Sequence, residues 1–115
     1  MEHTAKQINQ RLKEAENILI ISHKNPDGAT LSSACALMQY LRTIEVNHTA
    51  FCATSINPHM RFLPHIEYFI TDPALFERMK FDTIVVLDSG DLAYAGVAHH
   101  ITALSYEPII NNIDH

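Results

Sequence analysis

Short, uninterrupted apolar runs alternate along this chain with stretches whose apolar residues recur at helical spacing. The apolar runs at 17–22 and 83–87 have the pattern of strands buried on both faces of a parallel sheet. Shorter apolar segments predict further strands at 48–54, 66–70 and 108–113. Five strands are therefore expected, and most of them are separated by residues of a different periodicity.

Helical spacing separates several of these strands. Ile8, Leu12 and Ala15 lie on one face of an amphipathic segment, and the mostly apolar stretch 29–44 keeps the same period. Asp72-Pro73 predicts the start of a helix that runs to about residue 80, since aspartate caps helices and proline suits the first helical position. This order predicts an α/β fold, a doubly wound and mainly parallel sheet of about five strands.

Length and composition limit the fold to one globular domain. The chain has 115 residues, of which 47% are hydrophobic, which is enough for one core and excludes a disordered chain. The longest apolar run, Ala34 to Met38, is far too short to span a bilayer, so no membrane partner is expected. Cys35 and Cys52 cannot form a disulfide scaffold and are interpreted as packed, reduced thiols of a cytoplasmic protein.

The net charge of −5 is concentrated at one end of the sequence. All 8 basic residues precede residue 81, whereas residues 81–115 contain acidic groups and no Lys or Arg. A surface for nucleic acid would need the opposite charge. The acidic stretch is either an ordinary solvated face or part of a site for divalent cations.

Potential metal ligands follow three of the predicted strands. His23 and Asp27 follow the first, Asp88 follows the fourth, and Asp114 and His115 follow the last. In an open α/β sheet, ligands bind beyond the carboxyl ends of the strands, so these side chains would converge if the strands are neighbours. Each aspartate taken alone is more often a helix cap or a turn residue. Three predicted strands that all end in potential metal ligands are harder to explain in that way.

Three segments resemble the motifs of the DHH phosphoesterases, a family that includes single-strand exonucleases, oligoribonucleases and exopolyphosphatases. The first motif reads Ile20-Ile-Ser-His-Lys-Asn-Pro-Asp-Gly-Ala-Thr-Leu-Ser-Ser33, the second Ile84-Val-Val-Leu-Asp-Ser-Gly-Asp91, and the third Ile109-Ile-Asn-Asn-Ile-Asp-His115. Order, spacing and strand context all match over about residues 17–115. The resemblance implies a two-manganese phosphoester hydrolase.

Site roles follow from this resemblance position by position. His23 and Asp27 would hold the first ion, Asp88 would bridge both ions, and His115 would bind the second. Asp114 would be a ligand or would orient His115, so the catalytic residues implied are Asp114 and His115. The implied partners are short oligonucleotides, nucleotides or other phosphoesters.

Two departures from the family pattern matter. Ala29 occupies the place of the second aspartate of the first motif, so the second manganese site is expected to be weak. The family's second motif histidine would directly follow His115, where the chain stops. The resemblance therefore implies that residues 1–115 are a DHH domain truncated at its carboxyl end, without the substrate-binding domain, and poor at hydrolysis.

Three other interpretations compete. A nucleotide-binding Rossmann module is disfavoured because no Gly-x-Gly is present. A haloacid-dehalogenase site would use Asp88 as nucleophile but needs Asp-x-Asp, which is absent. A non-catalytic relative that binds a nucleotide or a protein is favoured by Ala29. Elsewhere, His99-His100 is interpreted as a solvated pair, and His59 and His65 have no evident partner.

Overall fold

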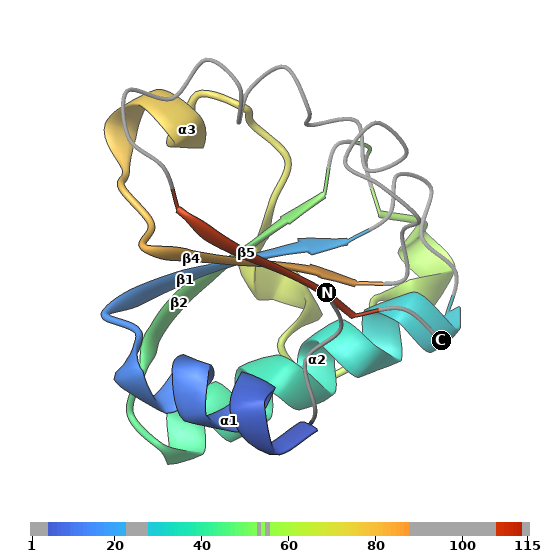
Figure 1. Cartoon of the computed structure of the whole chain (residues 1–115). Helices are drawn as coiled ribbons and strands as arrows, with labels where there is room; N and C mark the ends of the chain where they lie inside the picture. The colour runs from blue at the N-terminus through green and yellow to red at the C-terminus, as the bar shows by residue number, and fades with distance from the viewer. Residues whose placement is uncertain (1–4, 23–27, 53, 55, 88–107, 114–115) are drawn as a thin grey trace.

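The fold was described from a computed structural model, which describes residues 5–22, 28–52, 54, 56–87 and 108–113. Helices alternate with parallel strands along most of the chain (Figure 1). In chain order the elements are α1 Ala5–Glu14, β1 Asn17–Ser22, α2 Gly28–Thr43, β2 Asn47–Cys52, the 3-10 turns η1 Pro58–Met60 and η2 Ile66–Tyr68, β3 Phe69–Ile70, α3 Leu75–Arg78, β4 Thr83–Leu87 and β5 Ile109–Ile113.

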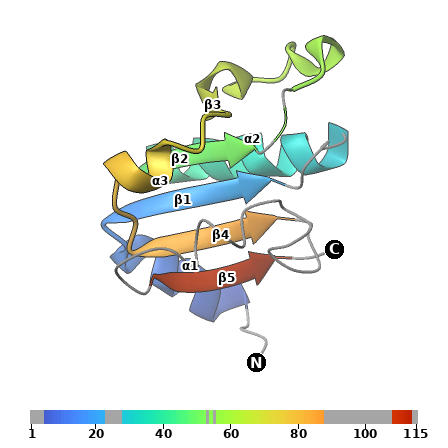
Figure 2. The same ribbon diagram turned by 90° about the horizontal axis from the view of Figure 1, so that it is seen from above.

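A five-stranded sheet of order β3-β2-β1-β4-β5 forms the middle layer, and every described strand pair is parallel. The chain winds outward from β1 to β3, then crosses back to place β4 on the other side of β1 (Figure 2). The predicted doubly wound α/β fold is therefore confirmed. The winding direction reverses between β1 and β4, which is the position where such sheets bind ligands.

Helices cover both faces of the sheet, as Figure 1 shows, with α1 and α2 on one side and α3 on the other. The first face packs Leu12, Met38 and Leu41 against Ile20 and Val85. The second face buries another apolar cluster: Leu19, Ile21, Phe51, Leu75, Phe76, Phe81, Ile84 and Val86. Burial on both faces explains why β1 and β4 are continuous apolar runs rather than alternating ones.

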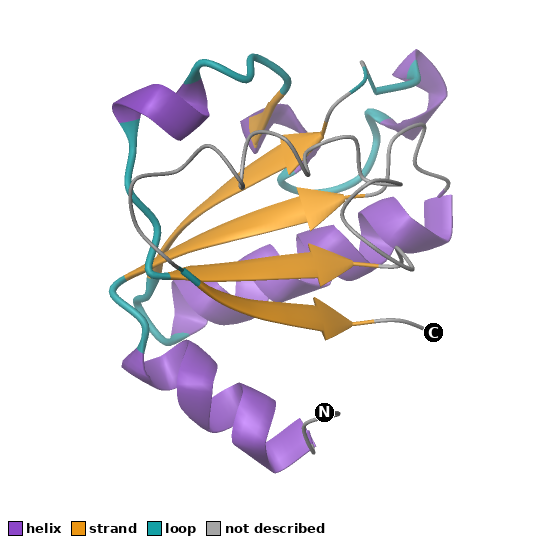
Figure 3. Ribbon diagram, turned by 45° about the horizontal axis from the view of Figure 1, so that its top comes forward, coloured by secondary structure: helices purple, strands orange, loops and turns teal. Residues whose placement is uncertain are grey.

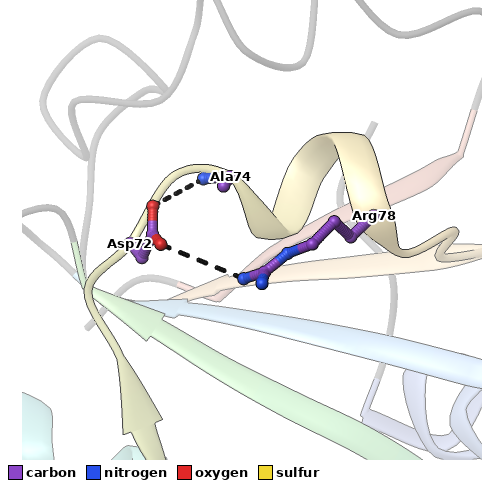
Figure 4. A network of polar contacts seen from close by, with 3 residues as sticks. All are labelled: Asp72, Ala74 and Arg78. Atoms are coloured by element: carbon purple, nitrogen blue, oxygen red, sulfur yellow. Dashed lines mark hydrogen bonds and ion pairs between the residues drawn. The ribbon is translucent and has the colours of Figure 1, made fainter.

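Two predicted elements are shorter than the sequence pattern suggested. The strand expected at 66–70 is the 3-10 turn η2 followed by the two-residue strand β3. The helix expected from Asp72-Pro73 to residue 80 is only α3, because Met79 is already extended with φ −124°. Asp72 Oδ1 does accept from the Ala74 N–H at 2.9 Å, and Asp72 Oδ2 lies 4.0 Å from Arg78 Nη2 (Figure 4).

The predicted packing of both cysteines is confirmed. Cys35 lies in α2 with Leu31, Ile56 and Ile66 in a third apolar cluster, and Cys52 is buried at the end of β2. Burial, with a smaller contribution from the Glu67 carboxylate, raises the pKa of the Cys35 thiol. The thiol is therefore protonated near neutral pH, which argues against a nucleophilic role.

Asp82 joins the amino-terminal ends of β1, β4 and β5. Its Oδ2 accepts from the Glu16 N–H at 2.8 Å and its Oδ1 from the Asn17 N–H at 3.0 Å. Its own N–H donates to the Asn17 carbonyl oxygen at 3.1 Å, and its carbonyl oxygen accepts from the Ile109 N–H at 2.9 Å. This member of the acidic carboxyl-terminal stretch thus bonds backbone groups at the start of the sheet.

We expect Asp82→Ala to lower the free energy of unfolding by about 1 kcal/mol, because two N–H donors lose a charged acceptor at a largely exposed site. Asp82→Asn keeps one carbonyl acceptor and should lose less. Denaturant unfolding of the three proteins measures both changes. Equal stability of wild type and Asp82→Ala would contradict a role for this carboxylate in joining the strands.

Candidate functional site

The carboxyl ends of three neighbouring strands lie level with one another. Ser22 at the end of β1 is in register with Leu87 at the end of β4, and Leu87 is in register with Ile113 at the end of β5. Figure 3 shows the arrowheads of the strands reaching the same edge of the sheet. Neighbouring strands are about 4.8 Å apart, so three adjacent chain segments leave the sheet at this edge within a small area.

The candidate ligands are the residues that come next in the chain. His23 follows Ser22, Asp88 follows Leu87, and Asp114 and His115 follow Ile113. Asp27 directly precedes Gly28, the first residue of α2. All five lie outside the described residues, so their geometry stays a prediction. The described structure does establish that the residues preceding three of them are paired in register on β1, β4 and β5.

Ser22 leaves a polar atom at this edge. Its side chain is buried, with 0% exposure, and its Oγ has no hydrogen-bond partner within the described part of the chain. A buried hydroxyl without a partner costs about 1–3 kcal/mol, so such groups are usually satisfied or retained for function. Ser22 directly precedes His23 in the sequence, and a buried hydroxyl without a partner among the described residues is compatible with a polar, ion-binding environment at the strand ends.

The donor set also fits a hard or borderline divalent cation. Carboxylate and imidazole groups suit manganese, whereas the two thiols of this chain are buried in the core. Ala29 lies in the first turn of α2 and offers no ligand atom. Across the described ranges, no group of three or more His, Cys, Asp or Glu side chains could hold a metal ion.

The sequence did not predict one group of polar side chains that lie in contact in the structure. Arg42, Gln39 and His65 form a hydrogen-bonded network, and Tyr68 lies against Arg42 and His65. His65, which the sequence left without an evident partner, thus has two. Residues from α2 and η2 meet only because the segment after β2 folds back over α2, which spacing along the chain does not reveal.

Comparison with solved structures finds chains of similar fold. The fold is similar to the crystal structure of an exopolyphosphatase-related protein from Bacteroides fragilis, with a TM-score of 0.76, 17% sequence identity and coverage of 94% of this chain. The chain spans 38% of that protein's length. At this identity the likeness shows the fold.

Searches by sequence were negative, since no family model and no curated protein matches the chain. Within the described residues, no helix is both long and apolar enough to cross a membrane.

Proposed function

We propose that this chain is the metal-binding domain of a manganese-dependent phosphoester hydrolase of the DHH type. His23 and Asp27 would hold the first ion, Asp88 would bridge to the second, and His115 would complete the second site. Asp114 would bind the second ion or orient His115. The observation that carries the proposal is the register of Ser22, Leu87 and Ile113.

The position of this edge in the sheet supports the assignment. The winding direction reverses between β1 and β4, so the segments that carry His23 and Asp88 leave the sheet on either side of the switch point. The β5 segment, which carries Asp114 and His115, leaves from the next strand. Ligands separated by 65 residues, as His23 and Asp88 are, would then start from neighbouring strand ends.

Bound manganese would lower the pKa of a water molecule and stabilise charge on the phosphoryl oxygens. The proposed ligand side chains would hold the ions in fixed positions, and their carboxylates would supply negative charge. The Asp88 and Asp114 carboxylates would follow strands that are paired in register, and β4 is buried along its whole length, so the sheet would give the rigid support that precise coordination needs. The similarity to an exopolyphosphatase-related protein is in keeping with phosphoester or phosphoanhydride substrates.

Ala29 favours one alternative, a non-catalytic relative that binds a nucleotide or a protein. Its side chain is a methyl group at the position where the family pattern has an aspartate. In that case the fold would be kept and nucleotide affinity would not depend on manganese.

A combined binding and hydrolysis experiment separates the two functions. Manganese is titrated calorimetrically into the chain, and hydrolysis of a short oligoribonucleotide, single-stranded DNA, a cyclic dinucleotide and polyphosphate is then followed with manganese or calcium. We expect one tight manganese ion, a weaker second and slow hydrolysis that requires manganese. Nucleotide binding that is unchanged by a chelator, with no hydrolysis of the four substrates, would support the alternative instead.

Ala29→Asp should strengthen the second manganese site roughly tenfold or more, because it adds a charged oxygen ligand in the first turn of α2. Calorimetry measures the second binding step, and the hydrolysis rate should rise with it. Ala29→Asn is the matched control, since it has a similar shape without the charge and should gain much less. No gain from Ala29→Asp would mean that the first motif does not map onto this chain as proposed.

A further inference from the structure

A hollow of about 300 Å³ opens at the edge of the sheet where β2 pairs with β3. It is lined by residues of the carboxyl-terminal half of α2, of β2, of η2 and of β3. Figure 2 shows β3 at this margin of the sheet, beyond β2 and next to α2. Both apolar and polar residues line the hollow. Met38 and Ala50 are apolar, and Arg42, His48 and Tyr68 carry polar groups.

A tight turn brings Arg42 and His48 together. The Val46 N–H donates to the Leu41 carbonyl oxygen at 2.9 Å and the Glu45 N–H donates to the Arg42 carbonyl oxygen at 3.2 Å. Glu45 takes the left-handed conformation, with φ 59°, that such helix ends require. The chain therefore reverses at once from α2 into β2, so a residue of the last helical turn lines the same hollow as one near the start of the strand.

Arg42 is held in place without a carboxylate partner in the described structure. Its guanidinium carbon lies 5.2 Å from the centre of the Tyr68 ring, and its Nη1 lies 3.1 Å from His65 Nδ1. The ion pair found between described side chains joins Arg78 and Asp72, not Arg42. A guanidinium that is positioned by neutral groups keeps its full charge and remaining N–H donors for an anion.

His65 and its neighbours explain how this position is maintained. A guanidinium only donates, so His65 Nδ1 must accept from Arg42, and His65 Nε2–H then donates to Gln39 Oε1 at 2.7 Å. The His65 ring also stacks on Tyr68, with ring centres 6.0 Å apart. Arg42 and Tyr68 are thus both held by His65, which lowers the entropy cost of binding a ligand between them.

His48 supplies a second polar group to the hollow. Its Nδ1 lies 2.8 Å from the Val46 carbonyl oxygen, and because a carbonyl only accepts, Nδ1 carries the hydrogen. Its Nε2 has no hydrogen-bond partner among the described residues. When the ring is protonated, Nε2–H becomes a donor that an anion could use together with Arg42.

We propose that this hollow binds a small organic anion. Arg42 and His48 would hold a single carboxylate or phosphate group, and Met38 and Ala50 would contact a short apolar or aromatic body. The volume of the hollow, about 300 Å³, is enough for a small ligand such as phenyl phosphate. Glu45 lines the adjoining hollow with Arg42 and His48, so its negative charge disfavours long polyanions.

This site lies at the amino-terminal end of β2, because His48 is near the start of that strand and Arg42 is in the last turn of α2. The candidate metal ligands follow the opposite, carboxyl-terminal ends of the strands. The proposed anion site therefore does not depend on the proposed hydrolase function and can be tested without manganese.

Phenyl phosphate, benzoate, inorganic phosphate and neutral benzamide serve as probes, with backbone amide chemical shifts as the readout. We expect saturable shifts at Thr49, Ala50 and Tyr68 with phenyl phosphate, benzoate or both, and the stronger of the two identifies a phosphate or a carboxylate ligand. Arg42→Gln should weaken this binding at least about tenfold, since a charge-assisted contact is lost. Arg78→Gln, which removes an exposed arginine on α3, should leave it unchanged.

Three results would overturn the proposal. One is the absence of saturable binding of both aromatic anions. Another is equal affinity of the wild type and Arg42→Gln, which would show that the guanidinium is not used. The third is binding of benzamide or inorganic phosphate as tight as that of the aromatic anions, since the site requires a charge and an apolar body together.

Discussion

Replacing Asp88 with asparagine should weaken the tightest manganese site at least about 100-fold, as measured by calorimetric titration. The proposed bridging carboxylate follows Leu87, the last residue of β4, between the ends of β1 and β5. Asparagine keeps the shape but loses the negative charge, and manganese needs charged oxygen ligands. Loss of even an outer partner of a metal ligand commonly costs 10- to 100-fold in affinity, so loss of a direct, bridging ligand should cost at least about the upper figure.

Glu77→Gln is the matched control for Asp88→Asn. It removes the same charge from an exposed side chain on α3, and manganese affinity should be nearly unchanged. Denaturant unfolding of Asp88→Asn without metal verifies that the fold is kept. If Asp88→Asn and wild type bound manganese equally, the strand-end site would be wrongly assigned.

Phe51→Ala should lower the free energy of unfolding by about 3–5 kcal/mol, the range found when a large buried ring is removed from a core. Phe51 is 1% exposed in β2 and packs edge-on against Phe76, with ring centres 5.3 Å apart. Its neighbours in the sheet, Ile21 and Ile70, are in register with it and belong to the same apolar layer. A domain of this size has a total stability of about 5–15 kcal/mol, so much of it depends on this one ring.

Phe62→Ala is the matched control, because the Phe62 ring is 77% exposed. Its removal should change the unfolding free energy by less than about 0.5 kcal/mol. Denaturant unfolding followed by circular dichroism compares the three proteins, and Phe51→Leu provides a milder change if Phe51→Ala is largely unfolded. Similar losses at positions 51 and 62 would contradict the described core.

The sequence predicted the central strands well because their pattern is strong. The runs 17–22 and 83–87 match β1 and β4 residue for residue, since burial on both faces requires continuous apolar side chains. At the margin of the sheet the pattern was misleading. The apolar residues of 66–70 point to a strand, but they mainly cover α2 through the turn η2, and only Phe69 and Ile70 pair with β2.

The candidate metal site was predicted from residue types and motif order alone, and the described structure adds the register that would bring its segments together. The anion site had no counterpart in the sequence analysis. Arg42 and His65 are 23 residues apart, and neither belongs to a recognisable motif. Their contact depends on how the segment after β2 folds back onto α2, which local spacing does not encode.

The sequence by itself determined that this protein has a parallel α/β sheet covered on both faces, since strand and helix periodicities are local properties of the chain. It also determined that histidine and aspartate follow three of the strands. Only the tertiary structure decided the order β3-β2-β1-β4-β5 and the register of Ser22, Leu87 and Ile113. Order and register depend on hydrogen bonds and packing between segments far apart in the chain, which a local pattern does not specify.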